Sequence, residues 1–201
     1  MSDFYALLYR MRYTLRWSSL FYFLPEDVSQ HSCNVAMITH GLAVLKNERY
    51  HGNVDVGRAV VCALYHDAAD VVVTHMIAPV KQHNVQMSRA VLEFHNEVND
   101  YCIDLLPEIM RDSFTSVFHV DDDPEIADII SCADQVDALF KCRFEVERGN
   151  SDFIIPLSEI EVKLEKTSST RPYFEHFLRE FVVHVNNGAP YPRYMRRNPN
   201  V

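Results

Sequence analysis

The sequence predicts an all-α protein, and three observations lead to that prediction. Apolar residues recur three and four positions apart over long stretches, which is the spacing that covers one face of a helix. Only 5 of the 201 residues are glycine, which is few for a protein built on hairpins or on a glycine-rich phosphate loop. Finally, 48% of the residues are hydrophobic, a normal value for a globular protein with a buried core.

The first helices follow from this spacing and from capping residues. A helix that begins near the N-terminus ends near Arg16, where an aromatic stretch with a proline begins. Asp27 or Ser29 caps a second helix, which places His31 one turn inside and ends before the turn at 51–53.

The third predicted helix starts at Val56 and places His66, Asp67 and Asp70 in its last turns. Residues 74–84 are expected to form a loop or a short turn. Further helices are expected at 87–106, 107–117, 124–148, 156–166 and 172–185.

The helix at 124–148 begins at Pro124 with Asp123 as its cap, because proline is well tolerated at the first position of a helix. It places Asp134 beside an apolar face. No internal repeat or linker interrupts the chain, so we expect a single domain over residues 1–190, followed by a poorly ordered tail at 191–201.

Composition excludes several classes of partner. The formal net charge of −9 argues against nucleic acids and anionic membranes, because proteins bind these through an excess of Lys and Arg. Arg193, Arg196 and Arg197 are too few to reverse this. No window approaches 18 uncharged apolar residues, so no membrane span is expected. The five cysteines form no CxxC pair and are expected to be buried thiols of a cytoplasmic protein.

The consecutive residues His66 and Asp67 point to a metal site. On a helix their side chains diverge by about 100°, so they can approach one ion from two directions. The dipeptide is common by chance, and a hydrogen-bonded core histidine beside a solvated carboxylate is the simpler alternative. A His in an earlier helix, His31, and an Asp in a later one, Asp134, strengthen the metal hypothesis, since such N and O ligands suit Mn, Co, Fe, Zn or Mg.

At this point the sequence resembles a known family, the bacterial 5'-deoxynucleotidases of the HD superfamily. The resemblance covers nearly the whole chain, and the order and spacing of the motifs agree together. The matching motifs are Arg16-Trp17, Val28-Ser29-Gln30-His31-Ser32, Gly52-Asn53-Val54, Leu64-Tyr65-His66-Asp67-Ala68, Pro79-Val80-Lys81, Ala133-Asp134 and Lys141-Cys142.

The resemblance implies an HD-domain helical bundle and a divalent metal ion (Co, Mn, Zn or Mg) that activates water for hydrolysis of a 5' phosphoester. It implies that the metal is held by His31, His66, Asp67 and Asp134. It also implies a homodimer or larger homo-oligomer that acts on a small deoxynucleotide.

The same resemblance assigns substrate contacts. Arg16 would grip phosphate, Trp17 would crowd the position of a ribose 2'-hydroxyl, and Lys81 would be a second phosphate cation. Ser18 and Ser19 are candidates for the wall that contacts the base. The alternatives are a helix-end cation for Arg16, a core aromatic for Trp17 and a solvated side chain for Lys81.

Departures from the family pattern concern the catalytic side. The usual Glu before His31 is Gln30, the loop's first Pro is Ile77, and the usual catalytic Glu is the shorter Asp70, which keeps a carboxylate able to orient water. Together with His66 and Asp67, Asp70 is therefore a candidate catalytic residue. If a second metal binds, Asp70 is its most natural ligand.

A further departure bears on the substrate, because His75 replaces a loop Asp and removes a negative charge near the phosphate path. By a narrow margin this favours a dATP triphosphohydrolase, an activity found in related phage enzymes, over a 5'-deoxynucleotidase acting on dNMPs; His75 at the surface without a role is the alternative. A nucleotide-binding helical module without catalysis is the alternative of another class.

The remaining histidines are expected at packing or surface positions: His40, His51, His83, His95, His119, His176 and His184.

Overall fold

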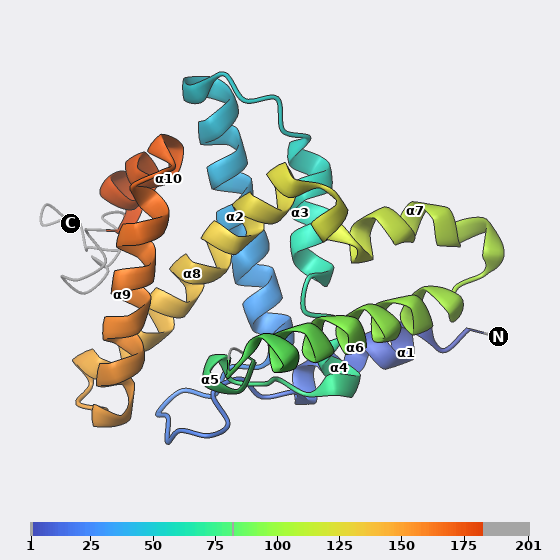
Figure 1. Cartoon of the computed structure of the whole chain (residues 1–201), viewed down its shortest axis with the longest axis horizontal. Coiled ribbons are helices and arrows are strands. Elements are labelled where there is room, and N and C mark those ends of the chain that lie inside the picture. Colours follow the sequence, from blue (N-terminus) through green and yellow to red (C-terminus); the bar gives the residue numbers. More distant parts are fainter. Residues whose placement is uncertain (1, 82, 183–201) are drawn as a thin grey trace, which may run out of the picture.

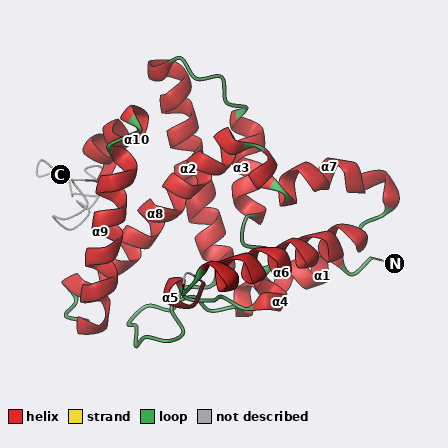
Figure 2. Ribbon diagram, viewed as in Figure 1, coloured by secondary structure: helices red, strands yellow, loops and turns green. Residues whose placement is uncertain are grey.

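The computed structural model describes residues 2–81 and 83–182, and within them the secondary structure is helical, as predicted (Figures 1 and 2). In this part of the chain there is no strand, only an isolated bridge between Leu15 and Asp27. The α-helices are α1 (Phe4–Leu8), α2 (Val28–Tyr50), α3 (Val56–Tyr65), α4 (Asp70–Val73), α5 (Ala78–Lys81), α6 (Val85–Asp104), α7 (Glu108–Phe118), α8 (Pro124–Glu147), α9 (Ile154–Ser168) and α10 (Pro172–Phe177).

Helix α2 lies at the centre of the molecule, with α3 and α8 packed against it and α10 beside it (Figure 1). Its buried face is part of one hydrophobic cluster that also draws on α3, α6, α7, α8 and α10. Leu42 and Ile129 are completely buried in this cluster. None of the described helices combines the length and the apolar character needed to cross a membrane.

The first helix is shorter than predicted. Helix α1 ends at Leu8 and continues as a 3-10 turn over Tyr9–Tyr13, so Arg16 lies in an extended segment. Two backbone hydrogen bonds hold that segment against the start of α2: the Arg16 N–H donates to the Glu26 carbonyl (2.9 Å) and the Val28 N–H to the Thr14 carbonyl (3.0 Å). They close the loop at 17–25 and place Arg16 beside the first turn of α2.

The third helix also differs from the prediction. It ends at Tyr65, whereas the sequence predicted a helix that still included His66, Asp67 and Asp70. His66 is its last, capping residue, and the chain then turns before α4 begins at Asp70. The turn is held by hydrogen bonds between residues three positions apart, as in a 3-10 helix: the Ala68 N–H donates to the Tyr65 carbonyl, and the Asp70 N–H donates to the Asp67 carbonyl. This tighter spacing breaks the 3.6-residue period on which the prediction depended.

In the C-terminal half, α8 and α9 follow the prediction closely, but α10 ends at Phe177 and the chain continues as a π-helix over Leu178–Val182. Asp123 caps α8, accepting a hydrogen bond from the Ile126 N–H (3.3 Å), and Pro124 is the first helical residue. The predicted tail at 191–201 lies outside the described residues, and the single-domain organisation stays a prediction. Of the five free cysteines four are buried as expected, but Cys33 is exposed.

Candidate metal centre and active site

His31 is fixed in the first turn of α2. Asp27 and Gln30 form a capping box: the Asp27 carboxylate accepts from the Gln30 N–H (2.9 Å), and the Gln30 side chain accepts from the Asp27 N–H. His31 is completely buried, and its Nδ1 lies 2.7 Å from an oxygen of Asp137. A carboxylate at this distance keeps a proton on Nδ1, so Nε2 is the nitrogen that can bind a metal ion once the ion displaces its proton.

His66 presents its ring in the same way. Its Nδ1 lies 2.8 Å from the Ala63 carbonyl oxygen, which can only accept, so Nδ1 carries the proton. The rings of His31 and His66 are 5.2 Å apart between centroids. The Nε2 atoms of both residues are buried and have no hydrogen-bond partner among the described residues.

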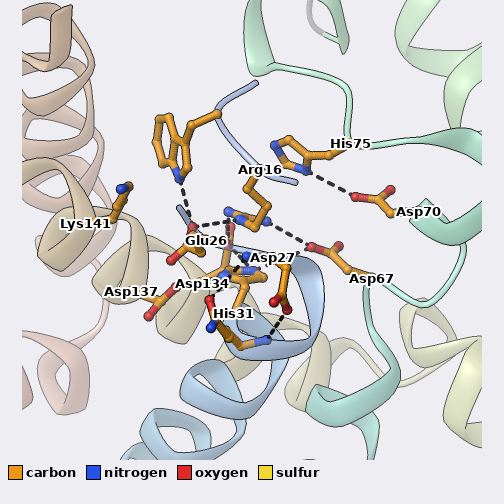
Figure 3. Close-up of polar contacts among 12 residues, drawn as sticks. Arg16, Glu26, Asp27, His31, Asp67, Asp70, His75, Asp134, Asp137 and Lys141 are labelled. Carbon is orange, nitrogen blue, oxygen red and sulfur yellow. Dashed lines mark hydrogen bonds and ion pairs between the residues drawn. The ribbon is translucent and has the colours of Figure 1, made fainter. Parts of the chain in front are cut away.

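Two carboxylates face these nitrogens. Asp134 Oδ1 lies 3.3 Å from His31 Nε2, and Asp67 Oδ2 lies 3.5 Å from His31 Nε2 and 3.6 Å from His66 Nε2. His31, His66 and Asp134 each offer one ligand atom within 4.8 Å of the others. The structure therefore brings together, from α2, α8 and the segment after α3, the four residues predicted as metal ligands; Figure 3 shows three of them.

The charge and chemistry of this cluster fit a divalent cation. Among the described residues, four carboxylates lie around His31 and the guanidinium of Arg16: Glu26, Asp67, Asp134 and Asp137. Burial alone would lower the pKa of His31, but Asp134 and Asp137 outweigh it and raise the pKa to about 9. An excess of negative charge around a buried histidine, with imidazole nitrogens that lack partners among the described residues, is what a bound cation would neutralise.

Arg16 lies at the centre of this network (Figure 3). It is 6% exposed, and its guanidinium contacts Glu26 (3.2 Å), Asp67 (3.1 Å) and Asp134 (3.8 Å). Burial alone would raise the pKa of Asp67, but His66, Arg16 and His31 hold it well below its usual range. Both carboxylates that face the histidines therefore stay ionised, since the pKa of Asp134 is lowered as well.

Trp17 is held in an unusual conformation. Its φ of 58° is rare for a bulky residue and marks a strained position. The indole Nε1–H donates to Glu26 Oε2 (2.8 Å), the oxygen that also accepts from Arg16, and the ring packs against Phe153 at 5.3 Å. Glu26 thus fixes Arg16 and Trp17 relative to each other.

Of the remaining predicted site residues, Asp70, His75 and Lys81 lie near the cluster, whereas Ser19 lies in an exposed loop. Asp70 is completely buried at the start of α4, and its Oδ2 lies 3.1 Å from His75 Nδ1. His75 is therefore not a free surface residue. Lys81 is near enough for its charge to lower the pKa of Asp67. Ser19 is exposed in the loop at 17–25, and its role stays a prediction.

Of the histidines expected to be packing or surface residues, His95 lies beside the pair of Asp70 and His75. It comes from α6, and its Nε2 lies 3.8 Å from Asp70 Oδ1, which is beyond hydrogen-bonding distance. Burial lowers the pKa of His95. By contrast His119 pairs with Asp100 and His176 lies against Tyr50, as expected of packing residues. His184 lies outside the described residues.

Sequence reasoning missed two carboxylates of this site, Glu26 and Asp137. Asp137 lies one helical turn after Asp134 on α8 and so shares its face, which is a signal that the sequence does carry. Glu26 has no such signal, because its partners lie about ten residues earlier across a loop.

Comparison with known proteins gives a family. The family model described as "5'-deoxynucleotidase YfbR-like" matches residues 3–185. A 4'-phosphooxetanocin A phosphatase of Priestia megaterium is 35% identical over 182 residues, covering 90% of this chain and 93% of that protein. The 5'-deoxynucleotidase YfbR of Shigella boydii serotype 18 is 33% identical over 183 residues, covering 90% of each.

Solved structures agree on the fold. An HD-domain phosphohydrolase from Listeria innocua superposes with a TM-score of 0.82 at 18% identity, covering 93% of this chain and 90% of that one. A cyanophage S-2L HD phosphohydrolase bound to dA and one catalytic Zn²⁺ ion gives 0.56 at 14% identity, covering 87% and 95%. The predicted HD helical bundle is thereby confirmed, and the chain belongs to the YfbR-like 5'-deoxynucleotidase family.

Proposed function

We propose that this protein is a metal-dependent phosphohydrolase that cleaves the 5' phosphoester bond of 2'-deoxyribonucleotides. The observation that carries the proposal is the pair of buried, unpartnered Nε2 atoms of His31 and His66 facing the carboxylates of Asp67 and Asp134. Leaving such polar atoms buried without partners is costly unless a ligand satisfies them. Its family membership supports the same chemistry.

The four side chains would hold one divalent ion, Co, Mn, Zn or Mg. When bound, the ion polarises a phosphate oxygen and lowers the pKa of water. Arg16 is positioned to bind the phosphate, because neutralising Asp67 and Asp134 with a metal weakens their hold on its guanidinium. Asp70 orients the attacking water.

The reaction balances as a simple hydrolysis. The water oxygen bonds to phosphorus, the bond between phosphorus and the 5' oxygen breaks, and a proton passes to that oxygen. The products are the deoxynucleoside and the released phosphate. Trp17, held by Glu26 next to Arg16, supports a preference for deoxyribose, because a rigid indole beside the phosphate-binding residue leaves little room for an extra hydroxyl.

For the substrate we rank deoxynucleoside 5'-monophosphates first, with dATP as the second candidate. The triphosphate hypothesis depended on His75 facing the phosphate path, and its Nδ1 instead lies 3.1 Å from Asp70. The names of the relatives also describe nucleotidases and a phosphatase. Lys81 is the observation that favours dATP, since its charge reaches the site and could contact a longer phosphate chain.

A substrate panel tests this proposal. The protein is stripped of metal, reloaded separately with Co, Mn, Zn or Mg, and incubated with the four dNMPs, the four dNTPs and the matching ribonucleotides. We expect orthophosphate and deoxynucleoside from dNMPs and little turnover of ribonucleotides. Inorganic triphosphate from dATP as the dominant product would establish the second candidate instead.

The panel also separates an enzyme from a nucleotide-binding module without catalysis. Nucleotide binding by calorimetry without product under any of the four metals would refute the enzymatic proposal. A small-molecule deoxynucleotide partner and a cytoplasmic location are part of this proposal. A homo-oligomeric state stays a prediction that light scattering measures.

A further inference from the structure

One carboxylate that the proposed metal centre does not use, Glu26, contacts two residues proposed to bind the substrate. Its Oε2 accepts a hydrogen bond from Arg16 Nε (3.2 Å) and another from the Trp17 indole N–H (2.8 Å). The Glu26 side chain is 11% exposed, and Figure 3 shows it on the side of the Arg16 guanidinium away from Asp67. Two donors from different side chains therefore share one acceptor oxygen.

Glu26 also lies near His31 and Asp137, but these three residues are not arranged to hold an ion. Each offers one ligand atom within 4.8 Å of the others. His31 Nδ1 is already bonded to Asp137 (2.7 Å), and His31 Nε2 faces the carboxylate of Asp134. Neither nitrogen is left for a metal held by Glu26. The contacts of Glu26 with Arg16 and Trp17 are therefore the ones through which it acts on the site.

The three carboxylates around Arg16 contact different nitrogens of its guanidinium. Asp67 lies 3.1 Å from Nη1 and Asp134 lies 3.8 Å from Nη2, whereas Glu26 accepts from Nε. A metal ion bound by Asp67 and Asp134 weakens their hold on the two Nη groups, which become available to a phosphate. The contact at Nε is not affected in this way. Glu26 therefore keeps the guanidinium in place while its other edge binds the substrate.

Trp17 needs a partner that fixes it, because its φ of 58° is unfavourable for a bulky residue. A strained backbone persists only where the surrounding contacts hold it. The ring packs against Phe153 with 5.3 Å between centroids, and such packing leaves it free to slide. The hydrogen bond to Glu26 is directional and fixes the indole N–H.

We propose that Glu26 is the positioning residue that sets the sugar preference of this protein, because it holds the Trp17 indole at a fixed place relative to Arg16. A nucleotide whose phosphate is bound by Arg16 then meets the indole with its sugar, and a ribose carries one hydroxyl too many. This inference rests on the proposed function, which it deepens by assigning the control of sugar selection to a residue that acts through two others.

The ratio of kcat/KM for dAMP to kcat/KM for AMP tests this role; dATP and ATP are used instead if the triphosphate is the substrate. Glu26→Leu keeps the side-chain size but removes both acceptor oxygens. Crowding of a hydroxyl discriminates by about 100-fold, so we expect this variant to lower the ratio at least about tenfold. Glu26→Gln keeps an oxygen that can accept both hydrogen bonds and should retain most of the ratio.

Two further variants separate this role from general damage. Glu161→Leu removes a carboxylate of α9 that pairs with Arg143 (3.3 Å), and it should keep the full ratio. Trp17→Ala should lower the ratio by itself, and adding Glu26→Leu to it should lower the ratio no further, because Glu26 acts through the indole. A further fall in the double variant would overturn the inference.

Intrinsic fluorescence gives a readout that needs no turnover, because Trp17 is the single tryptophan of the chain. In Glu26→Leu we expect the emission to shift to longer wavelength and acrylamide to quench it more strongly. Glu26→Gln and Glu161→Leu should resemble the unaltered protein. Circular dichroism confirms that each variant is folded.

The outcomes separate this inference from the proposed function. An unchanged ratio in folded Glu26→Leu, or no preference for the deoxynucleotide in the unaltered protein, overturns the inference and leaves the hydrolase function standing. If the unaltered protein binds nucleotides without hydrolysing them, the proposed function fails. The dissociation constants of the deoxynucleotide and the ribonucleotide then replace kcat/KM in the same comparison, and a ratio that falls in Glu26→Leu alone still supports the role of Glu26.

Discussion

Glu145 and His31 are both completely buried, yet their surroundings satisfy them differently. Each oxygen of Glu145 has two donors: Oε1 accepts from Lys141 Nζ (2.5 Å) and the Leu24 N–H (3.1 Å), and Oε2 from the Phe23 N–H (2.9 Å) and Asn150 (2.8 Å). Among the described residues, His31 has a hydrogen-bond partner only on Nδ1.

The difference separates a structural network from a binding site. The Glu145 network is complete in the protein alone and anchors the loop at 17–25, which carries Trp17, to α8. In the His31 cluster, the Nε2 atoms of His31 and His66 have no hydrogen-bond partner among the described residues, as expected of side chains that bind a ligand. Variants of the first network should therefore change stability, and variants of the second should change metal binding and turnover.

The largest effect is expected from removing a ligand of the first cluster. His66→Ala or Asp67→Asn should lose bound metal and lower kcat/KM by more than the roughly 100-fold that outer-sphere changes cost. Metal content and dNMP turnover are measured on the same samples, with His40→Ala as the control. A variant that loses its metal but keeps full activity would contradict the proposed site.

Breaking the Glu145 network should act on stability instead. Glu145→Gln leaves the buried Lys141 ammonium without its charged partner, which costs about 3–5 kcal/mol of unfolding free energy. Urea denaturation measures the loss, and metal stoichiometry should stay at the level of the unaltered protein. A change below about 1 kcal/mol would show that this network is not structural.

Because of the same carboxylate, we expect the free energy of unfolding to fall at acidic pH. Burial alone would raise the pKa of Glu145, but hydrogen bonds from Lys141, the Phe23 N–H and Asn150 lower it to about 2. A lowered pKa stabilises the fold above the unfolded value near 4.5, and the contribution, about 3 kcal/mol, is lost as the pH falls toward 2. Glu145→Gln should flatten the dependence of unfolding free energy on pH over this range; an unchanged slope would refute the assignment.

A smaller effect is expected from the residue that orients His31. Asp137→Asn keeps an oxygen near Nδ1 but removes its charge, so metal affinity should fall about 10- to 100-fold. Competition with a chelator measures the affinity. Equal affinity in the variant and the unaltered protein would show that Asp137 does not orient the ligand.

The smallest effect is expected at the cap of α2. Asp27→Ala removes the acceptor for the Gln30 N–H and should cost about 1 kcal/mol of unfolding free energy. Metal affinity should change little, because His31 is held mainly through Asp137. A loss of affinity as large as that of Asp137→Asn would mean that the cap positions His31.

What the sequence predicts well are the parts that local signals determine. The long helices α2 and α8 have capping residues and regular apolar spacing, so the positions of His31 and Asp134 follow from them. The end of α3 is not predictable in this way. After Tyr65, hydrogen bonds between residues i and i+3 replace the helical bonds between i and i+4, and no glycine or proline in the sequence marks the change. Motif resemblance, not helical period, identifies His66 and Asp67.

Partners that meet only through tertiary contacts are the least predictable. Glu26 meets Arg16 and Trp17 only when the loop at 17–25 closes, and His95 comes within 3.8 Å of Asp70 only when α6 packs against α4. The Asp137 carboxylate lies on a predicted face, but its partner is 106 residues away in the sequence. No local pattern reports such pairs.

Anomalous diffraction from crystals soaked in Co²⁺ or Zn²⁺, recorded at the absorption edge of the metal, tests the central claim most directly. The account predicts a peak within bonding distance of His31 Nε2, His66 Nε2, Asp67 and Asp134. A fully soaked crystal without a peak there, or with the metal bound only elsewhere, would contradict it.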